Sequence, residues 1–238
     1  MQIFVSDKGY IYVDAMKSVI EFHKALKLFA KYFSVPVTII ADSQKCHKSK
    51  EVKQFFHKIG TKLRILEGGT QRANREELHY GLFKEYVPKD MRNEDSPMVL
   101  WDYCSESIAS ITNMTAKNLF KVISNTSHFT TFGEDGYISN ICQFRCYGWI
   151  YFRKESAAFS FPSHVLRRWL VPAKNKGIEM AQCFLKSNYQ IAPLLTMRKI
   201  SSDEIVRESE FKKHADFAEA IKQRYGDSLY LSPWFKYT

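Results

Sequence analysis

The sequence predicts an α/β protein, because two short strands, a helix and a buried strand follow one another near its start. Residues 2–6 and 10–16 are rich in β-branched and aromatic side chains and flank the turn signal Asp7-Lys8-Gly9, which predicts a hairpin. Residues 19–33 carry apolar side chains at helical spacing. The apolar run 37–40 is typical of a strand that is buried on both faces.

Helix and strand patterns continue to alternate in the next part of the sequence. Residues 50–60 are amphipathic at helical spacing and end in a glycine, and residues 61–67 alternate like a strand. After a polar, glycine-led loop, residues 76–87 predict a helix, and residues 97–115 predict another helix with one apolar face. This order supports the α/β class.

The pattern changes in the second half of the chain. Between residues 137 and 200, short β-like runs are broken by glycine and proline, which predicts a small β-rich appendage. Residues 202–226 are charged and predict a helical tail. Four aromatic residues of the appendage predict a β core rather than a surface for base stacking. They are Tyr147, Trp149, Tyr151 and Phe152.

Basic residues outnumber acidic ones. Thirty-five lysines and arginines against 25 aspartates and glutamates give a formal charge of +10 and a pI near 9.3, which favours a polyanionic partner, nucleic acid first. No apolar run approaches the roughly 20 residues of a membrane-spanning helix, and the start does not resemble a signal peptide. We expect a nuclear or cytoplasmic protein, neither secreted nor membrane-bound, without a small-molecule substrate.

The cysteines predict neither a disulfide framework nor a zinc site. There are five, namely Cys46, Cys104, Cys142, Cys146 and Cys183. An odd number spread over a long chain argues against a set of structural disulfides. Cys142 and Cys146 are separated by three residues, but no second Cys or His pair has metal-finger spacing. Small buried thiols are the simpler interpretation.

Two carboxylates stand where α/β proteins carry reactive groups. Asp42 follows the predicted buried strand, at the sheet edge where ligands collect. Glu77 opens the helix that follows the glycine-led loop. Thirty-four residues separate the two acids, enough for a helix, a strand and a loop to bring the second back to the first. Such a pair of carboxylates suits Mg²⁺. The alternative is that the acid at the strand end is a surface cap and not a metal ligand.

Glu76 is the alternative to Glu77. Adjacent residues of a helix do not share a face, so the inward side of the predicted helix decides between them. The expected inward residues are Leu78, Leu82 and Tyr86. This orientation favours Glu77 as the site acid.

Basic residues gather near the same two acids. They are Lys45, Lys48, Lys50, Lys53, Arg72, Arg75 and Lys84. These cations would neutralise phosphates and make DNA binding strongly dependent on salt; the alternative is a solvated basic face. His47 lies among them in the sequence, and we expect its side chain to be exposed rather than to contact DNA.

Five sequence motifs follow one another in a specific order. IFVSDKGYIYVDAMKS reads as two strands around an Asp-containing turn, IIADSQK as a strand that ends in an acid, and GGTQRANREEL as a loop and an acidic helix start. SPMVLWDYCSESIASITNMT and GEDGYISNICQFRCYGWIYFR follow. This series, over about residues 1–200, resembles the integrases of copia-type LTR retrotransposons.

The resemblance implies a ribonuclease H-like mixed sheet flanked by helices in residues 1–125. A small β-rich unit in 137–200 and a charged helical tail or linker in 201–238 would follow it. It also implies DNA integration, by 3′-end processing and strand transfer with Mg²⁺ or Mn²⁺ held by Asp42 and Glu77. The implied partners are DNA, both element ends and target, and further copies of the chain in a homo-oligomer on that DNA.

The sequence also departs from the family. The family's first catalytic Asp lies on a strand before the hairpin with which this sequence starts, and neither Asp7 nor Asp14 fits that role. Ser43-Gln44-Lys45 and Gln71-Arg72 replace other residues usual in the family. We therefore expect a core that lacks its first strand, holds metal weakly and is inactive as a fragment. The alternatives are a degenerate nucleic-acid-binding remnant of an integrase and a nucleic-acid-binding module unrelated to transposition.

Overall fold

The computed structural model divides the chain into two compact units, Met1–Phe83 and Lys84–Thr238. The described residues are 1–16, 18, 21–33, 35–41, 45–66, 75–115, 125–136, 138, 144–153, 164–173, 181–194 and 197–226. Both units mix helices and strands, which confirms the α/β class. The predicted domain division at 125, 137 and 200 stays a prediction.

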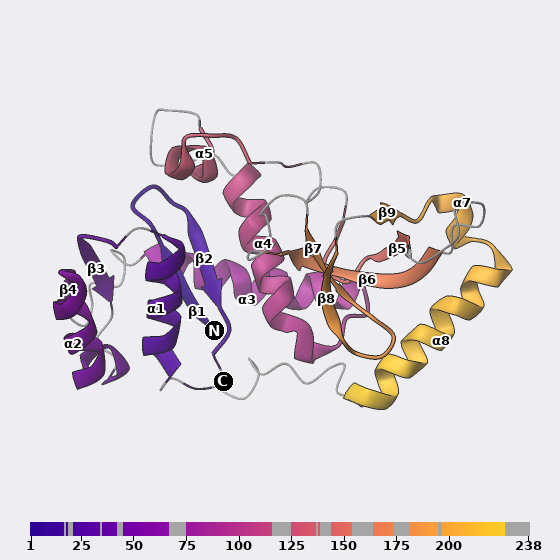
Figure 1. Ribbon diagram of the computed structural model, residues 1–238, viewed down its shortest axis with the longest axis horizontal. Helices are drawn as coiled ribbons and strands as arrows, with labels where there is room; N and C mark the ends of the chain where they lie inside the picture. Colours follow the sequence, from indigo (N-terminus) through magenta and orange to yellow (C-terminus); the bar gives the residue numbers. More distant parts are fainter. Residues whose placement is uncertain are drawn as a thin grey trace. The chain divides into compact units, whose positions relative to one another are not determined.

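The first unit holds two separate pairs of strands together with helices (Figure 1). Its elements are β1 (Gln2–Val5), β2 (Ile11–Asp14), α1 (Phe22–Tyr32), β3 (Thr38–Ala41), η2 (Lys45–Lys48), α2 (Lys50–Ile59), β4 (Lys62–Ile65) and the start of α3 (Arg75–Asn93). β1 and β2 pair antiparallel, which confirms the hairpin, and β3 and β4 pair parallel. Among the described residues no strand joins the two pairs.

One hydrophobic core holds both strand pairs. Its buried members are Phe4, Tyr12, Phe22, Ala25, Leu26, Val52 and Phe56, and Ile39 and Leu63 pack against them. The hairpin, α1 and α2 all contribute to it. Each fully buried large apolar side chain contributes about 1.5–3 kcal/mol to folding, so this cluster fixes the positions of the elements around it.

The strand predicted to be buried on both faces is buried on only one. Ile39 packs against the core, whereas Thr38 is exposed and Ile40 is 48% exposed. Val37, just before the strand, is 79% exposed. Parallel sheets normally carry cover on both faces, and the described residues cover only one face here. An apolar run predicts burial but does not reveal whether a second layer is present.

Local interactions set the ends of α2 and the direction of β4. The Ser49 hydroxyl accepts a hydrogen bond from the Val52 amide at 3.3 Å, which satisfies an otherwise unpaired N–H at the helix start. Gly60 ends the helix with φ 72°, the left-handed conformation that a glycine adopts without strain. The Thr61 hydroxyl then donates to the Pro36 carbonyl at 2.7 Å, so β4 starts beside the start of β3.

The second unit is built on a five-stranded antiparallel sheet in the order β8-β7-β6-β5-β9. Its elements are η4 (Met98–Leu100), α4 (Trp101–Thr115), α5 (Ser127–Phe132), β5 (Trp149–Arg153), β6 (His164–Pro172), β7 (Gln182–Leu185), β8 (Ile191–Leu194), β9 (Met197–Lys199), α7 (Ser202–Ile205) and α8 (Glu208–Tyr225). The strands lie within the region where the sequence predicts β structure, and the charged tail is helical as predicted.

The core of the second unit joins the sheet to the helices on either side of it in sequence. Its buried members include Leu100 before α4, Leu170 in β6, and Phe217 and Ile221 in α8. Tyr147 and Tyr151 belong to the same core and Trp149 packs against it, so the predicted β core is confirmed for these three residues, whereas Phe152 is not part of this cluster. α8 is therefore a packed element of this unit.

Candidate carboxylate site and nucleic-acid interface

The two acids at the start of α3 have different surroundings. Glu76 is partly buried, and its Oε1 accepts a hydrogen bond from the side-chain amide of Gln2 at 3.0 Å. Gln2 is the first residue of β1 and also donates to the Ile3 carbonyl. Glu77 is exposed. The acid that faces the strands is therefore Glu76.

The prediction of the inward face of α3 was wrong. Leu78 is 56% exposed, Leu82 39% and Tyr86 45%. The buried residues are Phe83, Val87 and Met91, which lie four residues apart along the opposite side. α3 carries apolar residues on two sides, so spacing alone does not reveal which side packs. The orientation of α3 therefore no longer favours Glu77 over Glu76. The catalytic role of either acid stays a prediction.

Asp42 and the glycine-led loop lie outside the described residues. The structure describes β3 up to Ala41, which is buried and pairs with Ile65 of β4. The convergence of Asp42 with the acid of α3 therefore stays a prediction. The other two acids fit the structural roles expected of them, because Asp7 lies in the exposed hairpin turn and Asp14 ends β2.

The described residues contain no group of three or more His, Cys, Asp and Glu side chains arranged to hold a metal ion. The predicted two-carboxylate site includes Asp42, which lies outside the described residues, so it stays a prediction. Glu76 has the surroundings that a ligand acid needs, since it is partly withdrawn from water and an amide donor fixes one of its oxygens. Glu77, exposed on the outer side of α3, lacks such a neighbour in the described hydrogen bonds.

Four of the predicted DNA-contacting cations are seen at the surface. Lys48, Lys50, Lys53 and Lys84 are all exposed. The first three lie at the end of η2 and on the first two turns of α2, and Lys84 lies on α3. The side chains of Lys45, Arg72 and Arg75 lie outside the described residues.

His47 is buried, against the prediction that it is exposed. It is 5% exposed, and its ring centroid lies 4.5 Å from that of Phe22 in α1. The short η2 segment turns this side chain toward the core while Lys48 remains in solvent. A histidine between lysines suggests exposure when only its sequence neighbours are considered, but the 3₁₀ turn separates neighbouring side chains onto different faces.

A second pair of exposed cations lies on β4. Lys62 and Arg64 are exposed, whereas Leu63 between them packs against the core. They stand opposite Thr38 and Ile40 in the register with β3, so basic and apolar groups share the uncovered face of this strand pair. The alternation KLRI would have predicted this shared face, because successive strand residues point to opposite sides.

An aromatic stack packs the second unit. The Arg168 guanidinium carbon lies 3.3 Å from the Trp149 ring centroid and 4.3 Å from that of Tyr147. On Trp149 the ring of His214 also stacks, with centroids 4.3 Å apart. Burial lowers the pKa of Arg168 to about 10, and its Nη1 donates to the Tyr147 carbonyl at 2.7 Å. These contacts hold α8 on the sheet, a structural role.

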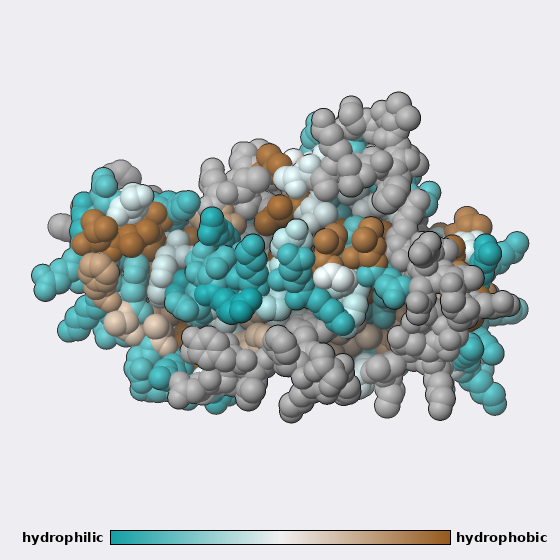
Figure 2. Space-filling model, turned by 180° about the vertical axis from the view of Figure 1, so that it is seen from behind, coloured by the Kyte–Doolittle hydropathy of each residue, from teal (hydrophilic) through white to brown (hydrophobic). Residues whose placement is uncertain are grey.

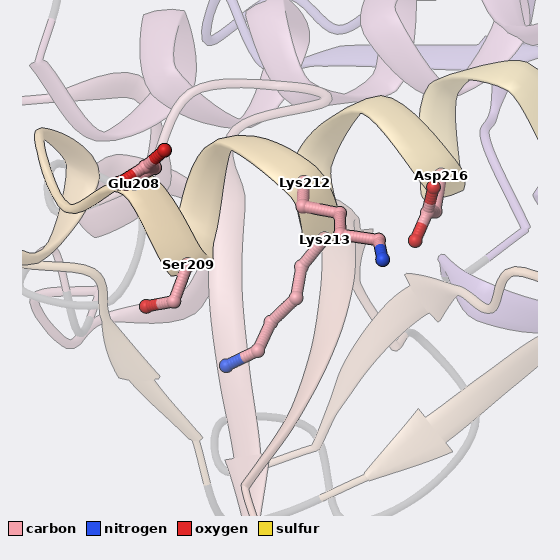
Figure 3. Close-up of a pocket in the computed structure, with 5 residues that line it drawn as sticks. All are labelled: Glu208, Ser209, Lys212, Lys213 and Asp216. Carbon is pink, nitrogen blue, oxygen red and sulfur yellow. The ribbon is translucent and has the colours of Figure 1, made fainter.

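A pocket of about 580 Å³ lies along α8, and Figure 3 shows the residues that line it. They are Glu208, Ser209, Lys212, Lys213 and Asp216. Two acids and two lysines balance each other, and Lys213 is already paired with Glu210, Nζ to Oε1 at 2.7 Å. The pocket has no net charge for a polyanion and no cluster of ligands for a metal.

No helix in the described part of the chain is both long enough and apolar enough to cross a membrane. In the view of Figure 2, exposed apolar residues form separate patches between hydrophilic ones.

Comparison with known proteins finds similarity in structure. No family model matches the chain, and no curated protein matches it. Among solved structures, the chain is similar to a chain in the cryo-EM structure of a simian T-cell lymphotropic virus intasome in complex with PP2A regulatory subunit B56 gamma. The TM-score is 0.45 and the sequence identity 14%, over 84% of this chain and 71% of the other.

Proposed function

We propose that this chain is a DNA-binding integrase-type core that takes part in DNA integration when a further strand completes it. The observation that carries the proposal is the division of the first unit into an antiparallel and a parallel strand pair around one shared core. A ribonuclease H-like mixed sheet contains both kinds of pairing. The motif resemblance supplies the expectation that its first strand precedes the hairpin.

Backbone directions support a place for such a strand. In the parallel pair, the Lys62 amide donates to the Val37 carbonyl and the Leu66 amide to the Ala41 carbonyl. Because backbone groups alternate in direction along a strand, those of Thr38 and Ile40 point to the edge away from β4. In the described residues no strand pairs with that edge.

The hairpin offers a second edge of the same kind. The Ser6 amide donates to the Tyr10 carbonyl, so the alternating bonds of the hairpin involve Phe4 opposite Tyr12. The backbone groups of Ile3 and Val5 then point away from β2. One strand placed between β1 and β3 would pair with both edges and convert two pairs into one five-stranded mixed sheet.

In this proposal Mg²⁺ or Mn²⁺ is held by Asp42 and an acid of α3. We propose Glu76 for the second position, because it faces β1 and is fixed by Gln2, with exposed Glu77 as the alternative. When bound, the ions would activate water or a DNA 3′-hydroxyl and stabilise the leaving oxygen. As the motif resemblance implies, we expect an assembly of several copies on DNA.

Salt-dependent DNA binding is the first experimental test. Replacing Lys48, Lys50 and Lys53 by Gln should weaken binding to a short duplex, measured by fluorescence anisotropy across a salt series. The slope of log affinity against log salt should fall by about 0.9 for each phosphate that is no longer neutralised. A matched control replaces the exposed Lys24, Lys27 and Lys31 of α1 by Gln. Equal effects of both triple variants would contradict a specific interface at α2.

A strand-transfer assay with Mg²⁺ or Mn²⁺ is the second test. Joining of DNA ends that is abolished by Asp42→Asn would support an active enzyme. Glu76→Gln should then abolish joining while Glu77→Gln leaves it intact, and the reverse would assign the role to Glu77. DNA binding without joining would favour the inactive remnant. Absence of DNA binding would overturn both functions.

A further inference from the structure

An apolar stripe runs from the end of α7 along one exposed side of α8. Ile205 is 40% exposed, Val206 69% and Phe211 58%. Ala215 and Ala218 follow Phe211 at helical spacing, so these three residues share one side of α8, and both alanines are exposed. We call the five residues the α8 stripe. Nothing in the proposed DNA chemistry uses it.

The α8 stripe is distinct from the side of α8 that packs on the sheet. Phe217 and Ile221 belong to the core of the second unit, and the ring of His214 stacks on Trp149. A surface helix normally needs one apolar side, the side that faces its own core. Large apolar groups that remain in water beyond that side mark a surface for interaction with another molecule.

Charged residues border the α8 stripe in an order that reverses along the helix. Glu208 lies in the first turn, at the left end of the helix in Figure 3, and Lys222 lies in the last turn. Both are exposed, and they stand at equal distances in sequence before and after Ala215. Nearer the middle, exposed Lys212 precedes Ala215 and exposed Glu219 follows it. The charges are therefore complementary to those of the same helix turned end for end.

We propose that the α8 stripe binds the α8 stripe of a second copy of this chain, with the two helices antiparallel about a twofold axis near Ala215. In this arrangement Glu208 of each copy faces Lys222 of the other. Phe211 of each copy packs on Ala215 and Ala218 of the other, whose small side chains let the helices approach closely. A parallel pair would instead place Glu208 against Glu208 and Lys222 against Lys222, and this repulsion disfavours it.

The size of this surface predicts a weak dimer. The 18 residues of α8 span about 27 Å, and one pair of such helices buries less than the roughly 1,200–2,000 Å² of a stable interface. The dimer should therefore form and dissociate reversibly as the concentration changes. Because its formation needs no DNA, the interface goes beyond the proposed function and does not rest on it.

Sedimentation velocity of the full chain at low salt, without DNA, tests the interface. The natural chain should shift from monomer to a discrete dimer as its concentration rises. Phe211→Lys should weaken the dimer at least about tenfold, because this aromatic contact occurs twice in it. Phe132→Lys makes the same change at a residue of α5 that is 46% exposed, and it should leave the dissociation constant unchanged.

Charge reversal tests the antiparallel arrangement. Glu208→Lys and Lys222→Glu should each weaken the dimer by about fivefold, because each places like charges together at two points of the dimer. The double variant exchanges the two charges and should restore the affinity of the natural chain. Far-UV circular dichroism checks that α8 stays helical in all three variants.

Three outcomes would overturn the interface. They are a monomer at every concentration up to the limit of solubility, a dimer that Phe211→Lys leaves intact, and a double charge variant as weak as the single ones. If Phe211→Lys does not fold, Ala215→Arg provides the same test, because it places two like charges together at the twofold axis. The lysine variants of α2 should keep the dimer, so a failure of DNA binding is distinguishable from a failure of this interface.

Discussion

One hydrogen bond distinguishes the neighbouring acids Glu76 and Glu77. Glu76 accepts from the buried Gln2 amide, whereas Glu77 stands in solvent. A bond between an amide and a charged acceptor is worth more than a neutral one, and its loss leaves a buried donor without its partner. Side chains one position apart on a helix therefore differ in their contribution to stability.

Glu76→Ala should lower the free energy of unfolding by about 1–2 kcal/mol, because Gln2 loses its acceptor. Glu77→Ala should change it by no more than about 0.5 kcal/mol, as expected for a surface position. Urea unfolding of the two variants and the natural chain measures both values. A larger effect at Glu77 would show that α3 presents its other side to the strands.

The pH dependence of stability should report on His214. Burial lowers the pKa of His214 from 6.5, and the positive charges of Arg168 and Lys213 lower it further. The negative charge of Glu210 acts in the opposite direction. Below about pH 6.5 the unfolded chain binds this proton more readily, so stability falls as pH drops and levels off below the folded pKa. His214→Phe keeps an aromatic ring on Trp149 and should remove the loss of stability that His214 causes at low pH. The free energy of unfolding of the variant and of the natural chain, measured across pH, gives the difference.

At the scale of elements, helix identity is easier to predict than helix orientation. α2 follows its sequence closely, with its cap at Ser49 and its end at Gly60. α3 does not, because it continues through Pro88 to Asn93 and buries the side opposite to the one expected. Capping depends on neighbours in sequence, whereas the packed side depends on elements far away in the chain.

The packing of α8 provides a matched test of orientation. Phe217 is 4% exposed and lies in the core of the second unit, whereas Phe211 on the same helix is 58% exposed. Phe217→Ala should cost about 3–5 kcal/mol, because removing the buried ring leaves a cavity. Phe211→Ala should remain within about 0.5 kcal/mol. Thermal or urea unfolding measures both, and equal losses would contradict the observed face of α8.

At the scale of the whole molecule, the sequence predicts the α/β class, the hairpin, most helices and a β-rich region before a helical tail. It does not predict the order β8-β7-β6-β5-β9, because strand pairing depends on contacts between distant segments. It also misses the exposure of Val37 and Ile40 at β3, since both residues are as apolar as buried ones. For the candidate site, the sequence predicts the residue types, but it does not predict that Glu76 rather than Glu77 contacts β1, because this contact joins distant segments of the chain.

The uncovered edge of β3 has a consequence for the handling of this protein in solution. In the described residues no strand pairs with this edge, and an unpaired apolar edge is a template on which another molecule adds its own strand. Ile40→Lys should place a charge beside that edge and reduce concentration-dependent association, as measured by sedimentation velocity at rising concentration. The exposed Thr38→Lys provides a comparison on the same strand. The chain is therefore expected to lose solubility at rising concentration by stacking through β3.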